Sequence, residues 1–376
     1  MTTIAVKRAV VCCGLASLLA IPGVASAQST AHQQLTATDS TWQLVADQPQ
    51  PSGIGQLVSV FATSRDNAWA GGTSGYLPLI EHWNGSSWSN VTPTGRAFQT
   101  ANTRVDGIGA SSGTNVWASV SSGTNGYAMR WNGKSWTKYS FHQYLTDDSI
   151  AVESRTDVWV FGLGGGSGPF ARHFNGTRWR AVSLPAVPMA QTAVGPNDIY
   201  AVGPKTPVTN SLGSASDVLM HWNGRSWRSI RLPGLKLTKT ELFAPAGITA
   251  TRASGVWITG DVMRSTGAEQ ILHHKLLHWT GRTWQVYSSP VSLGAVTPDG
   301  SGGVWMTDFT SGSPESFVHF ADGKFQLTTV PVPSSPVASP AVLMSGIGRI
   351  PGTASVWAVG SFVTDGYDAV IYRYGG

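Results

Sequence analysis

A short motif recurs seven times along this chain, and this repetition constrains the fold more than any other feature. In each copy a β-branched or small apolar residue precedes an aromatic residue, and a glycine usually follows. The copies are NAWAGG (67–72), NVWASV (115–120), DVWVFG (157–162), DIYAVG (198–203), GVWITG (255–260), GVWMTD (303–308) and SVWAVG (355–360). They recur about every 48 residues, so each repeat is long enough for one small sheet.

A second motif follows the first in the repeats and predicts a β-hairpin. Aromatic residues flank an Asn-Gly or related turn, as in EHWNGSSW (81–88). Further copies are MRWNGKSW (129–136), RHFNGTRW (172–179), MHWNGRSW (220–227), LHWTGRTW (277–284) and VHFADGKF (318–325). Asn-Gly between two strands favours a type I′ turn, in which both central residues have positive φ. The motif therefore joins the third strand of each unit to the fourth.

Segments of small residues precede the first motif and complete the unit. They include DGIGA (106–110), AGITA (246–250), SLGAV (292–296) and SGIGR (345–349). Small side chains suit innermost strands that crowd around a central axis. Each unit thus reads as small-residue strand, Trp strand, His-Trp strand and a fourth strand of the form W-x-x-V-x-x-P. Seven such antiparallel sheets predict an all-β fold, a seven-bladed β-propeller of four-stranded blades.

The two ends of the chain predict how the ring closes. The seventh repeat stops at IYRYGG (371–376) and lacks a fourth strand, whereas STWQLVADQP (40–49) matches the fourth-strand segment RTWQVYSSP (282–290). We therefore expect the N-terminal strand (40–49) to complete the C-terminal blade, which removes a frayed edge. The propeller domain then covers residues 40–376.

The first 27 residues predict a secretory signal peptide. Lys7 and Arg8 precede the apolar run AVVCCGLASLLAIPGVA (9–25), and the small residues 25–27 form a cleavage site. We expect a secreted, extracellular protein that is cleaved after Ala27, with a polar leader at residues 28–39. No later apolar run is long enough to span a membrane.

Cleavage of the predicted signal peptide also changes the cysteine content and the net charge of the chain. Cys12 and Cys13 lie in the signal, so the mature chain has no cysteine and depends on packing rather than on disulfides. Removal of Lys7 and Arg8 lowers the formal net charge by two, from +5 to +3. This weakly basic charge gives no indication of nucleic-acid binding.

The motifs resemble those of tryptophan-rich, Asn-Gly repeat propellers found in secreted bacterial proteins. The resemblance covers residues 40–376, and the chain is more distantly similar to kelch and Asp-box propellers, whose signatures are not intact here. It implies a propeller fold and export. It implies no particular reaction, because propellers include lectins, hydrolases, lyases, oxidases and passive scaffolds.

Residues that recur in every unit are interpreted as structural. The repeat aromatics supply the large apolar side chains that packing between twisted sheets requires. In five units a histidine precedes the hairpin aromatic: His82, His173, His221, His278 and His319. Arg130 and Arg373 take this place in the other two units, and a position that accepts arginine is not a metal ligand by design. No metal site is therefore expected, and HHKLLH (273–278) is assigned to a strand.

Loop lengths indicate where a ligand would bind. In a four-stranded antiparallel blade, the second-to-third loops and the inter-blade connections share one face. Length variation concentrates there, with insertions at 204–217 and 260–275, as expected where loops carry function on a rigid scaffold. The ligand-binding candidates assigned to this face are Tyr76, Arg96, Phe98, Arg104, Tyr144, Gln191, Lys205, Lys239, Phe243, Arg264 and Tyr367.

A basic cluster marks the outer strands of repeats three and four. It consists of Arg178, Arg180, Arg225, Arg228 and Arg231. Charged outer strands deter edge-to-edge pairing between molecules. Binding of an anionic wall polymer is the alternative interpretation.

The leading hypothesis is a monomeric, non-enzymatic binding or interaction protein. Its partner would be an extracellular glycan, a cell-envelope polymer or a protein. The alternative is an enzyme that processes an extracellular polysaccharide or glycoside, which needs two carboxyl groups about 5–10 Å apart. Asp106 with Asp147 or Asp148, near the mouth of the central channel, is the pair to inspect. Their oxygen atoms would also suit calcium, and no other cofactor is indicated.

Overall fold

The computed structural model describes most of the chain beyond the first 41 residues. The described residues are 42–98, 102–122, 126–164, 168–195, 197–205, 217–264, 270–310, 316–336 and 340–375, without the side chains of 146–148 and 163–164. The expected signal peptide (1–27) and leader (28–39) lie outside these residues. Within the described part all regular structure is β-strand, and no helix there is long and apolar enough to cross a membrane.

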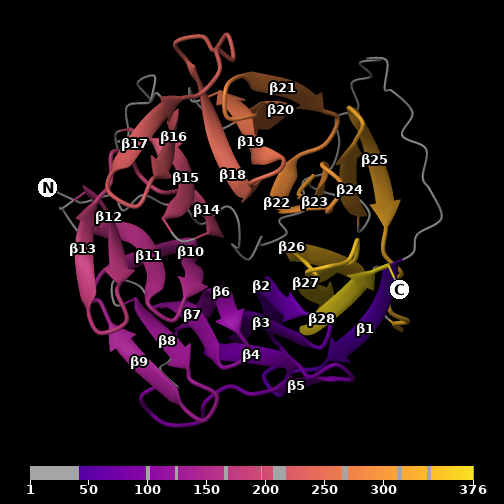
Figure 1. Cartoon of the computed structure of the whole chain (residues 1–376). Coiled ribbons are helices and arrows are strands. Elements are labelled where there is room, and N and C mark those ends of the chain that lie inside the picture. Colours follow the sequence, from indigo (N-terminus) through magenta and orange to yellow (C-terminus); the bar gives the residue numbers. More distant parts are fainter. Residues whose placement is uncertain are drawn as a thin grey trace, which may run out of the picture.

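Seven four-stranded antiparallel sheets follow one another around a ring (Figure 1). Blade one contains β2 (Gly55–Ser64), β3 (Asn67–Ser74), β4 (Leu77–Trp83) and β5 (Trp88–Asn90). Blade two contains β6 (Arg104–Ser112), β7 (Asn115–Ser121), β8 (Tyr127–Trp131) and β9 (Trp136–Ser140). Blade three contains β10 (Tyr144–Ser154), β11 (Asp157–Gly164), β12 (Gly168–Phe174) and β13 (Trp179–Ser183). In each blade the first strand is innermost.

The remaining blades continue the same order. Blade four contains β14 (Ala190–Gly195), β15 (Asp198–Pro204), β16 (Asp217–Trp222) and β17 (Trp227–Arg231). Blade five contains β18 (Glu241–Thr251), β19 (Gly255–Arg264), β20 (Gln270–Trp279) and β21 (Trp284–Ser289). Blade six contains β22 (Leu293–Pro298), β23 (Val304–Asp308), β24 (Ser316–Ala321) and β25 (Lys324–Thr329). Blade seven contains β26 (Ala341–Arg349), β27 (Val356–Val363), β28 (Tyr367–Tyr374) and β1 (Trp42–Gln48).

The seventh blade joins the two ends of the chain, which confirms the predicted closure. β1 pairs antiparallel with β28, and Trp42 lies opposite Tyr374. The Trp42 indole stacks on Phe317 with 4.2 Å between ring centroids, and its Nε1 donates to Thr328 Oγ1 at 3.0 Å. Phe317 and Thr328 belong to blade six, so the N-terminal strand ties blades six and seven together. The predicted fold, a seven-bladed β-propeller, is therefore confirmed.

Close approach of the innermost strands explains their small residues. A Cβ atom at Gly346 would lie 2.5 Å from Val58 O, and a Cβ atom at Gly348 would lie 2.5 Å from Val60 O. Both carbonyl groups belong to β2 of the next blade around the ring. Only glycine lets two backbones approach this closely.

The third-to-fourth hairpins mostly differ from the predicted type I′ turn. In blade one the flanking tryptophans pair with each other, so the four residues 84–87 form the connection. Only Gly85 has a positive φ, of 98°, and Asn84 Oδ1 accepts hydrogen bonds from the N–H groups of Ser86 and Ser87. The asparagine therefore acts through its side chain and not through a left-handed backbone.

Blade six contains the hairpin that fits the type I′ prediction. Ala321 pairs with Lys324, which leaves two residues in the turn. Both have positive φ, 52° at Asp322 and 76° at Gly323. The number of residues between the paired positions decides the turn type, and the Asn-Gly dipeptide alone does not reveal that number.

Polar contacts inside the blades account for the repeated histidines. In blade three, Asp157 Oδ1 accepts a hydrogen bond from Trp159 Nε1 at 2.8 Å and lies 3.0 Å from His173 Nε2. The His173 ring also stacks on Trp159, with 4.3 Å between centroids. Equivalent contacts join Asn67 to His82, Asp198 to His221 and Asp299 to His319. These histidines hold the second strand to the third and to the adjoining turn.

The insertion expected as a loop at 260–275 is largely strand. β19 pairs with β20 as far as Arg264 opposite Gln270, and β18 pairs with β19 as far as Glu241 opposite Arg264. The extra residues therefore lengthen blade five as a three-stranded ribbon, with Phe243 and Val262 buried in its core. Most of the other insertion, 204–217, lies outside the described residues.

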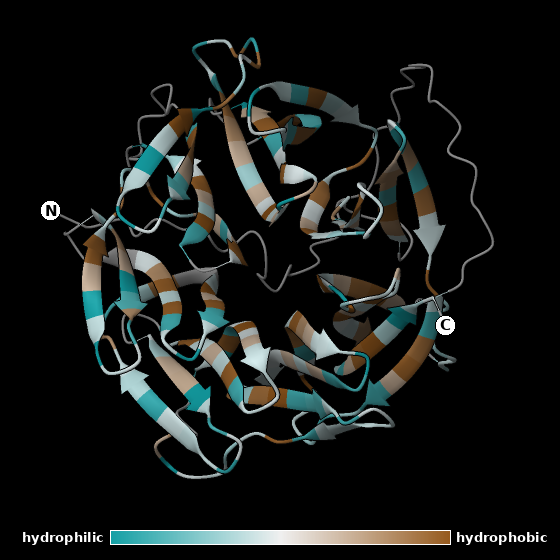
Figure 2. Ribbon diagram, in the orientation of Figure 1, coloured by the Kyte–Doolittle hydropathy of each residue, from teal (hydrophilic) through white to brown (hydrophobic). Residues whose placement is uncertain are grey.

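Hydropathy follows the strands in the expected way. In Figure 2 the outer strands of the ring show hydrophobic and hydrophilic residues along the same strand, since one side packs inward and the other faces solvent. The core consists of clusters that each span two neighbouring blades, such as one that joins Trp69 of blade one to β6–β8 of blade two. Neighbouring blades therefore share their cores.

Candidate functional site

The ring has two faces with different surface chemistry. The loop face carries the second-to-third loops and the connections between blades. The turn face carries the first-to-second turns and the third-to-fourth hairpins. This division follows from the up-and-down order of the strands within each sheet.

Exposed apolar side chains concentrate on the loop face. Tyr76, in the loop between β3 and β4, is 64 % exposed, and Leu343, near the start of β26, is 52 % exposed. Other large apolar residues exposed on this face are Leu77, Leu237, Ile271, Phe309 and Val332. The rest of the described residues contribute only Val45, Phe61 and Val286 to this class. Large apolar side chains that are exposed together on one face indicate a contact surface, whereas single ones scattered over a whole protein surface do not.

Four of the candidate basic residues also lie exposed on the loop face. They are Arg96, Lys205, Lys239 and Arg264. Lys205 lines a hollow of about 320 Å³ together with Asp217 and Arg231 at the outer part of blade four. Burial raises the pKa of Asp217 to about 7, so its carboxyl group is only partly ionised at neutral pH.

The two candidate phenylalanines take part in packing. Phe98 is half-buried against the core of blade two, and its carbonyl oxygen accepts a hydrogen bond from Tyr127 Oη at 3.3 Å. Phe243 is only 3 % exposed and lies in the core shared by blades four and five. A Cβ atom at Gly260 would lie 2.6 Å from the Phe243 ring, so the ring is tightly enclosed. Its ring is not accessible to a ligand.

Three further candidates sit at or inside strands. Tyr144 begins β10 and Tyr367 begins β28, and both are half-buried. Gln191 lies in the innermost strand of blade four, where it is 5 % exposed. Neither its Oε1 nor its Nε2 has a hydrogen-bond partner among the described residues. The equivalent register position in blade two is occupied by Ile108, so a polar side chain replaces a core residue here.

Asp106 is buried and engaged with a neighbouring arginine. Arg104 Nε donates to Asp106 Oδ1 at 2.7 Å. Burial raises the pKa of Asp106, and the charge of Arg104 only partly offsets this rise. The side chains of Asp147 and Asp148 lie outside the described part of the structure, although their backbone belongs to β10. Of the predicted carboxylate pair, one member is thus described.

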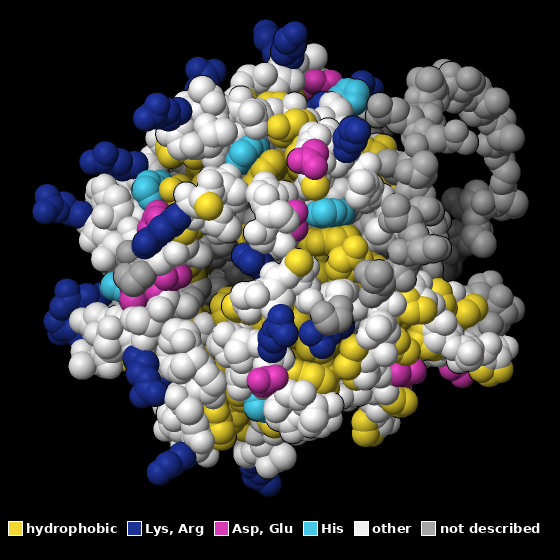
Figure 3. All heavy atoms as spheres, turned by 45° about the vertical axis from the view of Figure 1, so that its right-hand side comes forward, with side chains coloured by type: hydrophobic (Ala, Val, Ile, Leu, Met, Phe, Trp, Pro, Cys, Tyr) yellow, Lys and Arg dark blue, Asp and Glu magenta, His cyan; other side chains and the backbone are white. Residues whose placement is uncertain are grey.

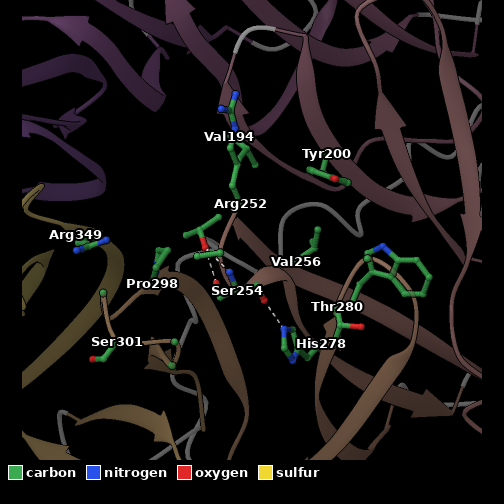
Figure 4. Close-up of a pocket in the computed structure, with 18 of the residues that line it drawn as sticks. Val194, Tyr200, Arg252, Ser254, Val256, His278, Thr280, Pro298, Ser301 and Arg349 are labelled. Carbon is green, nitrogen blue, oxygen red and sulfur yellow. Dashed lines mark hydrogen bonds between the residues drawn. The ribbon is translucent and has the colours of Figure 1, made fainter.

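A second hollow, larger than the one beside Lys205, lies on the opposite, turn face. It has a volume of about 860 Å³ and lies between blades four, five and six, with Arg349 of blade seven at its edge (Figure 4). Its lining includes Tyr200, the turn residues 251–255, 298 and 300–303, and the hairpin residues 279–281. Figure 4 shows Arg349 on one side of the hollow and His278 and Thr280 on another. Within the described ranges, no three His, Asp or Glu side chains converge as metal ligands do.

The repeat motif changes on the blade-five side of the hollow. Asn115 and Asp157 accept the indole N–H of the repeat tryptophan in blades two and three. Gly255 takes this place in blade five, with φ of 77°, and Trp257 Nε1 has no acceptor in the part of the chain that the structure describes. Turns of nearly constant length gave no reason to single out this face from the sequence, although Gly255 departs from the Asn or Asp of the motif and was a readable signal.

These features define the class of the protein: a seven-bladed β-propeller with exposed apolar side chains on its loop face and a hollow on its turn face. Neither a protein-family model nor a curated protein sequence matches the chain. Solved structures match it across most of its length at low sequence identity. At this level of identity the likeness concerns the fold alone.

Two of these structures illustrate the match. One is described as YCF48 bound to D1 peptide, at 13 % identity and a TM-score of 0.56, covering 91 % of this chain and 100 % of that chain. Another is a streptogramin B lyase structure, at 14 % identity and a TM-score of 0.59, covering 88 % of this chain and 97 % of that chain. They support the propeller fold.

Proposed function

We propose that this protein is a secreted, non-enzymatic scaffold that binds an extracellular polypeptide on its loop face. The observation that carries the proposal is the concentration of exposed large apolar side chains on that face. Tyr76 and Leu343 are the two most exposed members. A closed ring with shared cores keeps such side chains in fixed positions, which lowers the entropic cost of binding.

The chemistry of these side chains favours a polypeptide over a neutral glycan. Most of them are aliphatic, as Leu77, Ile271 and Leu343 illustrate, whereas sugar binding relies on open aromatic rings. Tyr76 and Phe309 are the aromatic members. A solved propeller of similar fold is described as bound to a peptide, and this also favours a polypeptide partner. The signal-like sequence at 1–27 supports an extracellular location.

The experiment selects peptides from a displayed random library on the purified protein and then tests them on variants. A loop-face variant carries Tyr76→Ser and Leu343→Ser. A matched control carries Val45→Ser and Val286→Ser, which removes exposed apolar side chains from the outer strands β1 and β21. We expect the selected peptides to bind the loop-face variant about tenfold or more weakly, as for central interface residues.

The result that contradicts the proposal is equal weakening in both variants. Equal retention by both variants would contradict it as well, because the loop face would then play no part. Retention of the protein on insoluble neutral polysaccharides, lost in the loop-face variant, would instead assign the same face to a glycan.

A further inference from the structure

The geometry points to a second binding surface, on the turn face, for an acidic polysaccharide chain. This surface lies on the opposite side of the ring from the loop face and does not depend on the partner proposed above. It consists of the hollow between blades four, five and six and of the basic side chains that surround it. The charge of this surface, the hollow in it and the residues that line the hollow support the inference.

Basic side chains form two arcs on the turn face. Five consecutive blades carry an exposed one at the third-to-fourth hairpin: Lys134, Arg178, Arg225, Arg282 and Lys324. The first-to-second turns add an inner arc: Arg65, Arg155, Arg252 and Arg349. Figure 3 shows Lys and Arg side chains projecting around the rim of the molecule. Asp66 and Asp322 are the exposed acids among the described residues of this face.

The other acidic residues of the turn face are already engaged. Asp157 pairs with His173, Asp198 lies 2.7 Å from His221, and Asp299 pairs with His319. Burial raises the pKa of Glu153 to about 7, and nearby Asp157 and Asp198 add to the rise. Three of these four carboxyl groups are occupied by histidines, and the nine basic side chains named above outnumber the four together with the two exposed acids. A surface with such an excess of positive charge attracts a polyanion.

Two arginines stand at the hollow itself. Arg252 reaches across to blade four, where its Nη2 lies 2.7 Å from the position of a Cβ atom on Gly195. Arg349 reaches across to Gly300 of blade six in the same way, and its Nε and Nη2 each donate to Thr353 O at 3.3 Å. Both guanidinium groups thus approach the hollow from neighbouring blades. Guanidinium groups form paired hydrogen bonds with carboxylates, which lysine cannot match.

The remaining lining suits a sugar chain better than a nucleic acid. Tyr200 offers a half-exposed ring that is stacked against His221, with 4.3 Å between centroids. Hydroxyl groups of Ser254, Thr280 and Ser301 also line the hollow. The volume of about 860 Å³ is within the range of pockets that hold small ligands. A few linked uronate residues match this combination of carboxylate, hydroxyl and ring contacts.

The test uses polygalacturonate and its fully methyl-esterified form as probes. The two polymers share one backbone and differ only in charge. Affinity electrophoresis of the purified protein in gels containing either polymer measures binding. We expect retardation by polygalacturonate and none by the ester, with retardation that weakens as salt is raised.

Variants then assign the site. Arg252→Gln with Arg349→Gln removes both guanidinium groups at the hollow, and Arg252→Gln with Arg282→Gln leaves the Arg349 turn bonds intact. The matched control, Lys239→Gln with Arg264→Gln, removes the same charge from the loop face. We expect each turn-face variant to bind polygalacturonate about tenfold more weakly, from the strength of charge-assisted hydrogen bonds. The control should bind like the parent protein.

Three outcomes would overturn the inference. Equal weakening in the turn-face and loop-face variants means non-specific attraction by net charge. Retardation by the methyl ester means that the carboxylates are not recognised. Binding of single-stranded DNA of similar length, together with no retardation by polygalacturonate, means that the surface takes a nucleic acid instead.

Discussion

Blades two and seven differ in one buried hydrogen-bond acceptor. Exchanging the residue at this position between the two blades tests how much such an acceptor stabilises the propeller. In blade two, Asn115 Oδ1 accepts from Trp117 Nε1 at 3.3 Å and from Arg130 Nε at 3.1 Å. Blade seven has the same two donors, Trp357 Nε1 and Arg373 Nε. Both are buried, and within the described ranges neither has a hydrogen-bond acceptor.

The difference between the blades lies in one residue. Ser355 occupies the place of Asn115, since each immediately precedes the Val-Trp pair of its motif. Its short side chain leaves the two donors of blade seven unsatisfied. A buried unsatisfied donor costs about 1–3 kcal/mol, and a charged donor costs more. We therefore expect Ser355→Asn to raise the free energy of unfolding by about 1–2 kcal/mol, and Asn115→Ser to lower it by about 1–3 kcal/mol.

Urea unfolding and differential scanning calorimetry measure both effects. For a domain of this length, 1 kcal/mol corresponds to a shift in Tm of about 1–2 °C, from the usual entropy of unfolding per residue. Ser355→Thr is the control, because it fills similar space without an acceptor that reaches both donors. The reasoning is refuted if Ser355→Asn is neutral or destabilising while Asn115→Ser is also neutral, because the donors would then need no protein acceptor.

Three further predictions follow from the closure, the polar pairs and the N-terminus. Trp42→Ala should lower the free energy of unfolding by about 3–5 kcal/mol, because Trp42 is 4 % exposed and stacks on Phe317. Urea denaturation measures this effect, with Val45→Ala as the control, and an unchanged denaturation curve would contradict the prediction. Burial alone would raise the pKa of Asp299, but hydrogen bonds from His319 and from the N–H groups of Ser301 and Gly303 hold it below its usual value. The stability that Asp299 contributes is then present above its unfolded-state pKa and is lost as the pH falls through its folded-state pKa, so Asp299→Asn should flatten the decline in unfolding free energy at acid pH. Expression of the full chain in a secreting bacterial host, followed by N-terminal sequencing, should find Gln28 first, and a chain retained in the cytoplasm with its first 27 residues would contradict the predicted signal.

A buried carboxyl group with a raised pKa makes stability depend on pH in the opposite sense to Asp299. Burial raises the pKa of Glu81 to about 7, although a hydrogen bond with Gln48 counteracts it. A raised folded-state pKa means that this group favours the folded state at low pH and loses that advantage as the pH rises through 7. Glu81→Gln should therefore make the protein more stable above neutral pH, relative to the parent, with little effect near pH 5.

The sequence by itself determined the blade count, the order of strands and the ring closure. Each repeat carries its own periodic pattern of aromatic, small and turn residues, and a pattern repeated seven times leaves few other arrangements. Trp42 could be matched to the fourth-strand tryptophans by pattern alone, and the pairing of β1 with β28 confirms that match. In the other six blades local patterns suffice, because the neighbouring strands of a blade are also neighbours in the sequence.

Tertiary structure decided which side chains are available for binding. Phe243 resembles a loop aromatic in sequence, but the extension of β18 and β19 buries it between two blades. The reach of Arg252 and Arg349 across neighbouring blades also depends on contacts between blades. The hollow of the turn face arises from the same contacts. Such features are set by residues far apart in the sequence, and no single repeat contains the information that places them.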